Sequence, residues 1–360
     1  MKRGTENVSF SRGMTLPELM VGLAVGLFVV TIAISTFVST RTLNVVNSSS
    51  TRMTENARLA TETLHTDLRS AGFGGCRTLE QRLDGPPVVT LNGGINAGFL
   101  TEGNSGVRGY RGTSSAHDPA LPTAVAAAAA GRLLNSDIVS IRVPADTVSM
   151  GLVATMGSTI APPQLAASAP GNTITQGDVL LISNCKAAAI FQVTSSDPFG
   201  TGTLTHAPGL LSPGNASQDL QQVFSSDSNV YRLQTRHYCV APSAMRPGTN
   251  SLWRISVPAP GGGALVPEEV ASGIDRLLIS YGIDSDGQPD LNVNRYVNAS
   301  GVTDWDRVLS ARVQLIAATA ENNMAQGVQK YTFNGATVTA SDKRLRTVLT
   351  EVVTLRNGAP

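Results

Sequence analysis

The sequence predicts an α+β protein, in which one long N-terminal helix precedes an antiparallel, β-rich domain with long loops. Two observations lead to this fold class. The first is an apolar run, Met14–Val38, that continues into a helical pattern as far as Ala71. The second is a series of short alternating segments rich in β-branched residues, separated by stretches rich in Gly, Pro, Ser and Asn.

The apolar run is long enough to cross a membrane. Its 25 residues rise about 1.5 Å each, which exceeds a hydrocarbon core of about 30 Å. Basic residues outnumber the acid Glu6 in the short segment before it, where the cations are Lys2, Arg3 and Arg12. By the positive-inside rule we expect the N-terminus in the cytoplasm and the rest of the chain outside it.

The helix is expected to continue beyond the membrane as an amphipathic segment, residues 39–71. Its apolar positions recur every three or four residues, at Leu43, Val46, Met53, Ala57, Ala60, Leu64, Leu68 and Ala71. Glycines at 72, 74 and 75 end it. From Met14 to Ala71 such a helix would be about 87 Å long. We expect His65 to face outward from it.

Residues 72–360 are expected to form one β-rich domain without internal repeats. The predicted strands are Asp137–Val143, Asp178–Ser183, Ala188–Thr194, Asn229–Val240, Ser251–Val257, Arg276–Ile283, Ala311–Ala320 and Arg346–Leu355. Ala124–Gly131 and Val302–Leu309 are predicted as short helices, the latter opening at Thr303, and Met156–Gly177 as a loop. The loops between Gly85 and Asn135 match no pattern that suggests a ligand.

Composition and motifs argue against nucleic-acid binding and against catalysis. The formal net charge is +1, and the cations are scattered rather than clustered. The four histidines, His65, His117, His206 and His237, stand in no metal-ligand spacing, and His237 in its strand pattern is expected to be structural. No nucleophile elbow or phosphate-binding loop appears, and Gly261–Gly263 is expected to be a plain loop. The sequence therefore predicts a protein that is not an enzyme.

The N-terminal segment, Gly13–Met20, places a single carboxylate, Glu18, at the start of the apolar run. Together with the basic leader, this segment resembles the class III signal of type IV pilins and pseudopilins. The resemblance implies that prepilin peptidase removes residues 1–13 by cutting between Gly13 and Met14, that Met14 becomes N-methylated, and that residues 14–38 span the inner membrane. A Sec signal peptide is the alternative, but no small-residue cleavage site follows promptly.

Pro17 offers a physical argument for the cut. Inside an uncut helix its ring would clash with the carbonyl of Gly13, four residues back. After cleavage Pro17 becomes the fourth helical residue, where an amide has no intrahelical acceptor in any case.

Four segments of the remaining chain resemble the PilW family of minor pilins. They are Gly177–Cys185, Ala189–Thr194, Gly273–Leu277 and Tyr281–Asp284. The resemblance implies a non-enzymatic pilus subunit with a periplasmic domain that helps to prime type IV pilus assembly, supports twitching motility and adhesion, and sits at the pilus tip. Its implied partners are prepilin peptidase, other minor pilins, the major pilin, a large tip adhesin and inner-membrane lipid.

Three other classes of protein stay open. A minor pseudopilin of the J kind in type II secretion would share the signal and the architecture. A membrane-anchored adhesin or a membrane-anchored periplasmic enzyme would share the anchor.

Glu18 is the main candidate for function, because a carboxylate in an apolar segment costs about 2.5–3.5 kcal/mol on insertion scales unless it is neutralised. In a pilin-type assembly the α-amino group of Met14 on the adjacent subunit would be its partner. The alternative is that Glu18 only neutralises the N-terminus of its own helix. Gly22 and Gly26 form a Gly-x-x-x-Gly pair that would let another helix approach closely.

The three cysteines allow at most one intrachain disulfide, and the residues alone do not choose among the pairings of Cys76, Cys185 and Cys239. The resemblance to minor pilins favours Cys76–Cys185, and three unpaired buried thiols are the alternative.

Asp284, Asp286 and Asp290 lie in a Gly- and Pro-containing turn that can hold Ca²⁺ through oxygen ligands. The turn fails the EF-hand pattern, because Gln288 and Arg295 occupy ligand positions. A solvated hairpin loop between Tyr281 and Tyr296 is the other interpretation.

Overall fold

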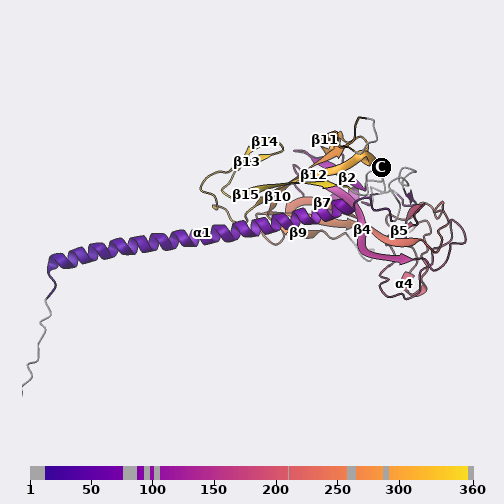
Figure 1. Cartoon of the computed structure of the whole chain (residues 1–360), viewed down its shortest axis with the longest axis horizontal. Helices are drawn as coiled ribbons and strands as arrows, with labels where there is room; N and C mark the ends of the chain where they lie inside the picture. Colours follow the sequence, from indigo (N-terminus) through magenta and orange to yellow (C-terminus); the bar gives the residue numbers. More distant parts are fainter. Residues whose placement is uncertain are drawn as a thin grey trace, which may run out of the picture. The chain divides into compact units, whose positions relative to one another are not determined.

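The computed structural model describes residues 13–75, 87–92, 98–100, 106–209, 211–257, 265–286 and 292–355. Contacts divide the chain into two compact units, Met1–Thr51 and Arg52–Pro360. A single helix, α1 (Leu16–Ser70), crosses the boundary between them. The predicted fold class is confirmed, because a long N-terminal apolar helix leads into a β-rich, mostly antiparallel domain (Figure 1).

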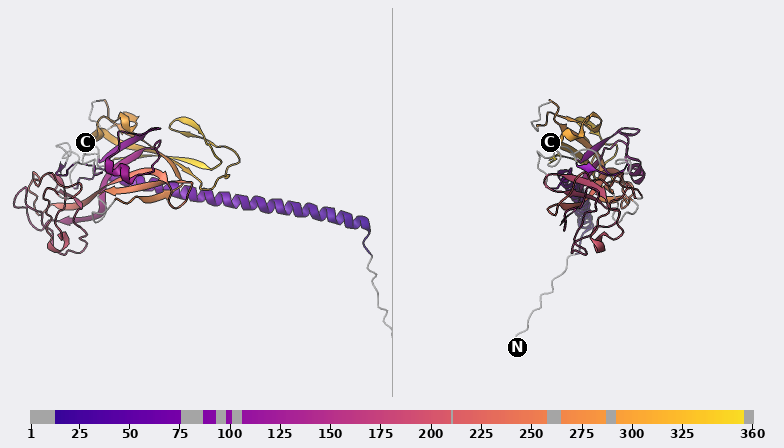
Figure 2. Two further views of the ribbon diagram at one scale, coloured as in Figure 1. Left: turned by 180° about the vertical axis from the view of Figure 1, so that it is seen from behind. Right: turned by 90° about the vertical axis from the view of Figure 1, so that its right-hand side faces the viewer.

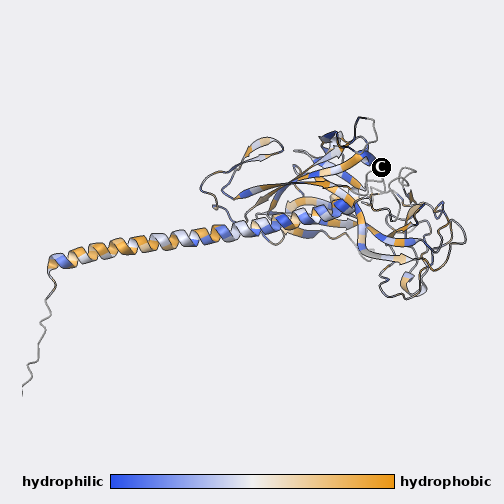
Figure 3. Cartoon of the chain, viewed as in Figure 1, coloured by the Kyte–Doolittle hydropathy of each residue, from blue (hydrophilic) through white to orange (hydrophobic). Residues whose placement is uncertain are grey.

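Helix α1 changes character along its length (Figure 3). Its first part is apolar nearly all round and carries exposed Leu, Val, Ile and Phe side chains. In the second unit its apolar stripe is buried, and it consists of Met53, Ala57, Ala60, Leu64 and Leu68. Leu43, which the sequence pattern placed on the same stripe, lies in the first unit and is 61% exposed.

The larger sheet has nine strands. Seven follow the order β1-β6-β5-β7-β4-β2-β3, while β8 pairs with β7 and β9 pairs with β8. All pairs are antiparallel except β1 with β6. The strands are β1 (Val88–Val89), β2 (Val107–Gly112), β3 (His117–Asp118), β4 (Ile138–Gly151), β5 (Val179–Ser183), β6 (Ala188–Gln192), β7 (Asn229–Pro242), β8 (Asn250–Val257) and β9 (Glu268–Ser272).

The smaller sheet has four antiparallel strands in the order β11-β10-β12-β15. They are β10 (Ile274–Ile283), β11 (Arg295–Val297), β12 (Val308–Ala318) and β15 (Arg346–Thr354). A hairpin, β13 (Lys330–Phe333) with β14 (Ala336–Thr339), projects from this sheet and is drawn in yellow in Figure 2.

Gly273 lets the chain pass from one sheet to the other. It lies between β9 and β10 with φ +78°, in the left-handed region that favours glycine, and a Cβ there would lie 2.7 Å from the carbonyl oxygen of Ala318. The chain can therefore change direction at this one residue, between the end of β9 and the start of β10. The main core forms where β4, β7 and β8 of the large sheet, the small sheet and the second part of α1 meet.

Buried polar groups also join these layers. One carboxylate oxygen of Asp137 accepts from the amide of Gly112 on β2 at 2.8 Å, and the other accepts from the amide of Ile279 on β10 at 2.9 Å. Burial raises the pKa of Asp137. Because these two amides belong to different sheets, the Asp137 side chain joins the two sheets through hydrogen bonds.

The eight strands predicted from the sequence are all present, and their ends are shifted by at most three residues except in β4, which continues eight residues beyond Val143. The short helices are α3 (Thr123–Ala128) and α4 (Pro198–Thr201), with 3-10 turns η3 (Ala299–Gly301) and η4 (Trp305–Arg307). The alanine run is thus helical as predicted. The helix predicted over Val302–Leu309 was too long, because Asp304 rather than Thr303 caps a single turn and β12 already begins at Val308.

Candidate assembly interface

The start of α1 carries one half of a capping box, the half in which the acidic side chain reaches back to the residue before the helix. The carboxylate oxygen Oε2 of Glu18 accepts from the backbone amide and from the hydroxyl of Thr15, both at 2.9 Å. The amide of Leu19 donates to the carbonyl of Thr15 at 3.1 Å, which closes the first turn. Thr15 and Glu18 therefore stand in the Thr-x-x-Glu relation that typifies a helix N-terminus.

This geometry overturns the argument from Pro17. Because α1 begins at Leu16, Pro17 is the second helical residue, and its missing amide belongs to the first turn, which has no intrahelical acceptor. Gly13 precedes the helix, so no helical carbonyl meets the proline ring. Pro17 is tolerated with or without cleavage, and the cut between Gly13 and Met14 stays a prediction that rests on the resemblance.

Oε1 of Glu18 accepts no hydrogen bond from the residues that the structure describes, since both bonds of the carboxylate go to Oε2. The side chain is thus compatible with the role of a cap on its own helix and still offers one oxygen to a donor from outside the chain. A cation from another subunit would find that oxygen at the start of an exposed apolar surface.

A shallow groove runs along the first part of α1 beside Gly22 and Gly26. Its lining also includes Met14, Leu19, Leu23, Leu27 and Val30. A Cβ atom built on either glycine would meet nothing within 4 Å, so nothing in the described chain fills the groove. Such a strip of exposed backbone is the feature that lets helices pack closely in a membrane.

Several hydroxyl groups of this part of the helix donate to the helix backbone. Five of them donate to a carbonyl three or four residues back, at 2.7–3.0 Å, namely those of Thr31, Ser35, Thr36, Thr40 and Thr42. In lipid every polar group needs such a partner, because no water is available to supply one. The helix is long and apolar enough to cross a membrane by length and composition, and these five hydroxyl groups already have the partners that lipid would not supply.

Hydrogen bonds join the second part of α1 to two strands of the larger sheet. Asp67 accepts from the guanidinium of Arg236 at 2.7 Å and from the hydroxyl of Tyr238 at 2.5 Å, both on β7. The amide group of Asn56 donates to Ser272 on β9 at 3.0 Å. Burial, with Asp67 as neighbour, raises the pKa of Tyr238. Sequence reasoning did not single out Asp67, although an acid between Leu64 and Leu68 on a buried stripe signals a partner.

His237 and His65 both contact other side chains or backbone groups of the β-rich domain. His237 lies fully inside, with Nδ1 2.6 Å from the hydroxyl of Ser140 and Nε2 2.7 Å from the carbonyl of Gly98, as expected. Burial lowers its pKa to about 4. The expectation that His65 faces outward was wrong, because it is half-buried and contacts Glu351 on β15.

The structure describes two of the three cysteines. Cys185 is exposed and Cys239 is buried, and the two do not bond to each other. Cys76 lies outside the described residues, so the pairing Cys76–Cys185 stays a prediction. Burial raises the pKa of Cys239 to about 12, which leaves it a weak nucleophile.

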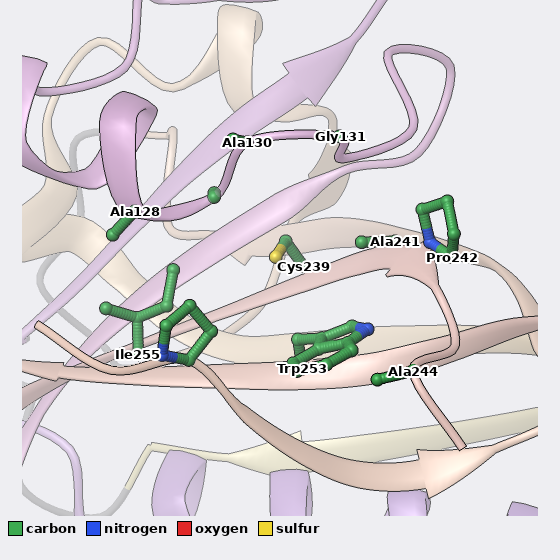
Figure 4. A pocket seen from close by; sticks show the side chains of 11 residues that line it. Ala128, Ala130, Gly131, Cys239, Ala241, Pro242, Ala244, Trp253 and Ile255 are labelled. Carbon is green, nitrogen blue, oxygen red and sulfur yellow. The ribbon is translucent and has the colours of Figure 1, made fainter.

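Cys239 lines an apolar cavity of about 320 Å³ between α3 and the β7–β8 pair (Figure 4). Trp253 forms one wall, and its indole Nε1 is buried without a hydrogen-bond partner among the described residues. The remaining lining is mainly alanine and proline. Nothing in this lining can take up or release a proton at neutral pH, so the cavity offers no catalytic group.

The strands on either side of the carboxylate turn, β10 and β11, pair antiparallel. Asp286 accepts from the side-chain amide of Asn294 at 2.9 Å, and Oδ1 of the buried Asp284 has no hydrogen-bond partner in the described chain. Asp290 lies outside the described residues. Among the others, no group of three His, Cys, Asp or Glu side chains could hold a metal ion. The Ca²⁺ site stays a prediction, which calorimetric titration of the protein with Ca²⁺ tests.

The fold and the surface together define a class of protein. Its members have a long N-terminal helix, whose first part is apolar and exposed, followed by a β-rich domain. Comparison with known families agrees with this class. The family described as PilW, Type IV Pilus-assembly protein W, matches residues 237–357, which is about a third of the chain. This match supports a protein related to type IV pili and implies a role in their assembly. No curated protein and no solved structure matches the chain.

Proposed function

We propose that this chain is a minor pilin of a type IV pilus, a structural subunit rather than an enzyme. In this role prepilin peptidase cuts between Gly13 and Met14, and the helix holds the protein in the inner membrane with its N-terminus cytoplasmic and its β-rich domain periplasmic. The chain then joins other minor pilins to prime addition of the major pilin. It supports twitching motility and adhesion as part of the pilus tip.

The observation that carries the proposal is the family match over residues 237–357 on a chain whose N-terminus resembles a prepilin signal. Both ends of the sequence thus point independently to the same assembly. The exposed apolar surface of α1 adds physical support, since it needs lipid or neighbouring helices to cover it. The size of the unit Arg52–Pro360 favours the tip, because a large domain would crowd its neighbours within a shaft.

Glu18 is proposed to act between subunits, with Oε1 receiving the cationic amine of Met14 from the adjacent chain. Leaving a buried carboxylate without its partner costs about 3–5 kcal/mol, which would fix the axial register of the subunits. Two substitutions separate this role from helix capping. Glu18→Gln keeps an oxygen that can accept hydrogen bonds from Thr15 but removes the charge, whereas Glu18→Ala removes both the oxygen and the charge.

The test measures membrane insertion, cleavage and incorporation into purified pili for each variant, with the exposed Glu55→Ala on the same helix as control. We expect Glu18→Gln and Glu18→Ala to be inserted and cleaved but to be lost from pili, and Glu55→Ala to behave as wild type. Normal incorporation of Glu18→Gln would show that Glu18 serves only as a cap.

Other measurements separate the proposal from its alternatives. Mass spectrometry of the membrane-extracted chain should find an N-methylated terminus at Met14. Deletion of the gene should abolish surface pili. Lost release of exoproteins with intact pili would indicate a pseudopilin, normal pilus number with poor attachment would indicate an adhesin, and turnover by the purified protein would indicate an enzyme.

A disulfide between Cys76 and Cys185 is also proposed, which would join the segment after α1 to the segment after β5. The hydroxyl of Ser183 donates to the carbonyl of Gly74 at 3.1 Å, and Cys76 and Cys185 each follow that contact by two residues in sequence. Peptide mapping of the unreduced protein tests it, and the finding of a bond to Cys239 in place of either partner would refute it.

A further inference from the structure

Strand β15 is an edge strand unlike the other edges of the described sheets. It pairs only with β12, and it is nine residues long. The other strands that end a sheet in the described chain, which are β1, β3, β9, β11 and the two strands of the hairpin, have two to five residues. Proteins protect edges by keeping them short or by placing charges on them, as β9 does with Glu268 and Glu269.

The register shows which groups of β15 lie on its open side. The amide of Leu355 donates to the carbonyl of Leu309, and that of Thr319 to the carbonyl of Leu345, so the odd-numbered residues bond to β12. The even-numbered residues therefore direct their backbone groups away from it. These are Arg346, Val348, Thr350, Val352 and Thr354.

One end of this open edge is capped by the chain itself. The side chain of Gln329 accepts from the amide of Arg346 at 2.7 Å and donates to its carbonyl at 2.8 Å. Beyond Arg346 no backbone group of Val348, Thr350, Val352 or Thr354 has a partner in the part of the chain that the structure describes. Eight hydrogen-bonding groups are thus left in a row.

The side chains on this stretch suit strand pairing. Val348, Thr350, Val352 and Thr354 are all β-branched and uncharged, and Val352 is 49% exposed. No lysine, proline or bulge interrupts them. Between them, Glu351 is already in contact with His65. An incoming strand would meet neutral β-branched neighbours, against which uncharged β-branched or aromatic residues pair best.

The length of the open stretch sets the length of a partner. A segment of about seven residues in extended conformation would match Val348–Thr354.

We infer that the open edge of β15, at Val348–Thr354, receives an extended, uncharged strand from another pilus subunit. The inference rests on the proposed function, which supplies the partner. Strand addition of this kind takes its affinity from main-chain hydrogen bonds and its specificity from alternate side chains.

Hydrogen exchange gives the direct test. Amide exchange is measured on the full-length protein in detergent, alone and co-purified with the co-expressed minor pilins. We expect the amides of Val348, Thr350, Val352 and Thr354 to exchange at least tenfold more slowly in the complex. The amides of Leu349, Glu351 and Val353 should be protected in both samples and serve as the internal control.

Unchanged exchange of the even-numbered amides in the complex would overturn the inference. So would their protection in the protein alone with a doubled mass in solution, since the occupant would then be a second copy.

Substitution at Thr350 gives a second test in the cell. Thr350→Pro removes an amide that β12 does not use, and edge strands tolerate proline at such a position. Thr350→Val loses the same hydroxyl contact to Gln314 but keeps the amide, so it is the matched control. We expect at least a tenfold loss of surface pili with Thr350→Pro and none with Thr350→Val. If Thr350→Pro fails to accumulate, Thr350→Lys replaces it, because lysine blocks edges without altering the backbone.

The outcomes separate this inference from the proposed function. Normal piliation with Thr350→Pro or Thr350→Lys, in cells where deletion of the gene abolishes pili, refutes the strand addition alone. Normal piliation after deletion of the gene refutes the proposed function itself.

Discussion

The two parts of α1 carry similar residues in opposite surroundings. Leu23 in the first part is 60% exposed, whereas Leu64 in the second part is fully buried. The first part is the more apolar, yet it contacts nothing in the described chain that would cover it. In the second part the apolar residues are methionine, alanine and leucine, and strands of both sheets cover them.

This difference teaches that hydrophobicity alone does not say which part of a helix stabilises the fold. The second part contributes to folding because the sheets bury it. The first part can contribute only to interactions outside the chain, with lipid or with other helices. The predictions below test this contrast, from the largest expected effect on folding to the smallest.

The largest effect is expected for Leu64→Ala. Truncating a fully buried leucine removes apolar contacts and leaves a cavity, which costs about 2–5 kcal/mol of the free energy of unfolding. Leu23→Ala in the first part should leave that free energy unchanged. Urea unfolding of the full chain in detergent, followed by the fluorescence of Trp253 and Trp305, measures both. Equal midpoints for the two variants would contradict the comparison.

Asp67→Ala should come next, at about 3 kcal/mol. It leaves the guanidinium of Arg236 without its partner and the buried hydroxyl of Tyr238 without an acceptor. Asp67→Asn retains an acceptor oxygen and should lose less. The exposed Glu62→Ala on the same helix is the control. If Asp67→Ala unfolds at the wild-type urea concentration, the ion pair does not hold α1 to β7.

A pH effect of about 2 kcal/mol is expected from His237. Its pKa is about 4 in the folded protein and about 6.5 in the unfolded chain, so the unfolded chain binds the extra proton as the pH falls. Stability from the neutral ring is present above pH 6.5, declines as the pH falls from 6.5 to 4, and is lost below 4. Unfolding free energies at pH 7 and pH 5 measure it.

His237→Gln provides the control for the pH effect, because it removes the titrating group from the same site. The difference between the two pH values should shrink by about 2 kcal/mol in this variant. Since the site lies in the second unit, the helical signal of the first part of α1 should not change with pH over this range. An unchanged pH dependence in His237→Gln would assign the effect to other groups.

The long elements of the fold were predictable because each carries its own periodicity. The eight predicted strands are mostly five residues or longer, and α1 ends at Ser70, just before the glycines that were expected to end it. The seven strands that were missed are short or weakly patterned, such as Val88–Val89 and Arg295–Val297. Two or three residues have no period, so their strand conformation is decided by the neighbours they pair with.

The division into two sheets was not predictable for a related reason. A single glycine, Gly273, moves the chain between them, and a positive φ leaves no trace in a hydrophobic pattern. At the candidate site the sequence singled out Glu18 and the two glycines, whose roles stay predictions, but not the bond between Glu18 and Thr15. It also missed Asp67, whose partners on β7 lie about 170 residues further along the chain.

Substitutions in the groove of the first part of α1 should have the smallest effect on folding. They should affect assembly instead. Gly22→Val adds a side chain in open space, so the unfolding free energy should change by less than about 0.5 kcal/mol. Ala24→Val makes a similar addition about 200° around the helix, away from the groove. If another helix packs at the glycines, Gly22→Val should reduce incorporation into pili while Ala24→Val should not. Equal incorporation of the two variants would show that no helix packs closely at the glycines.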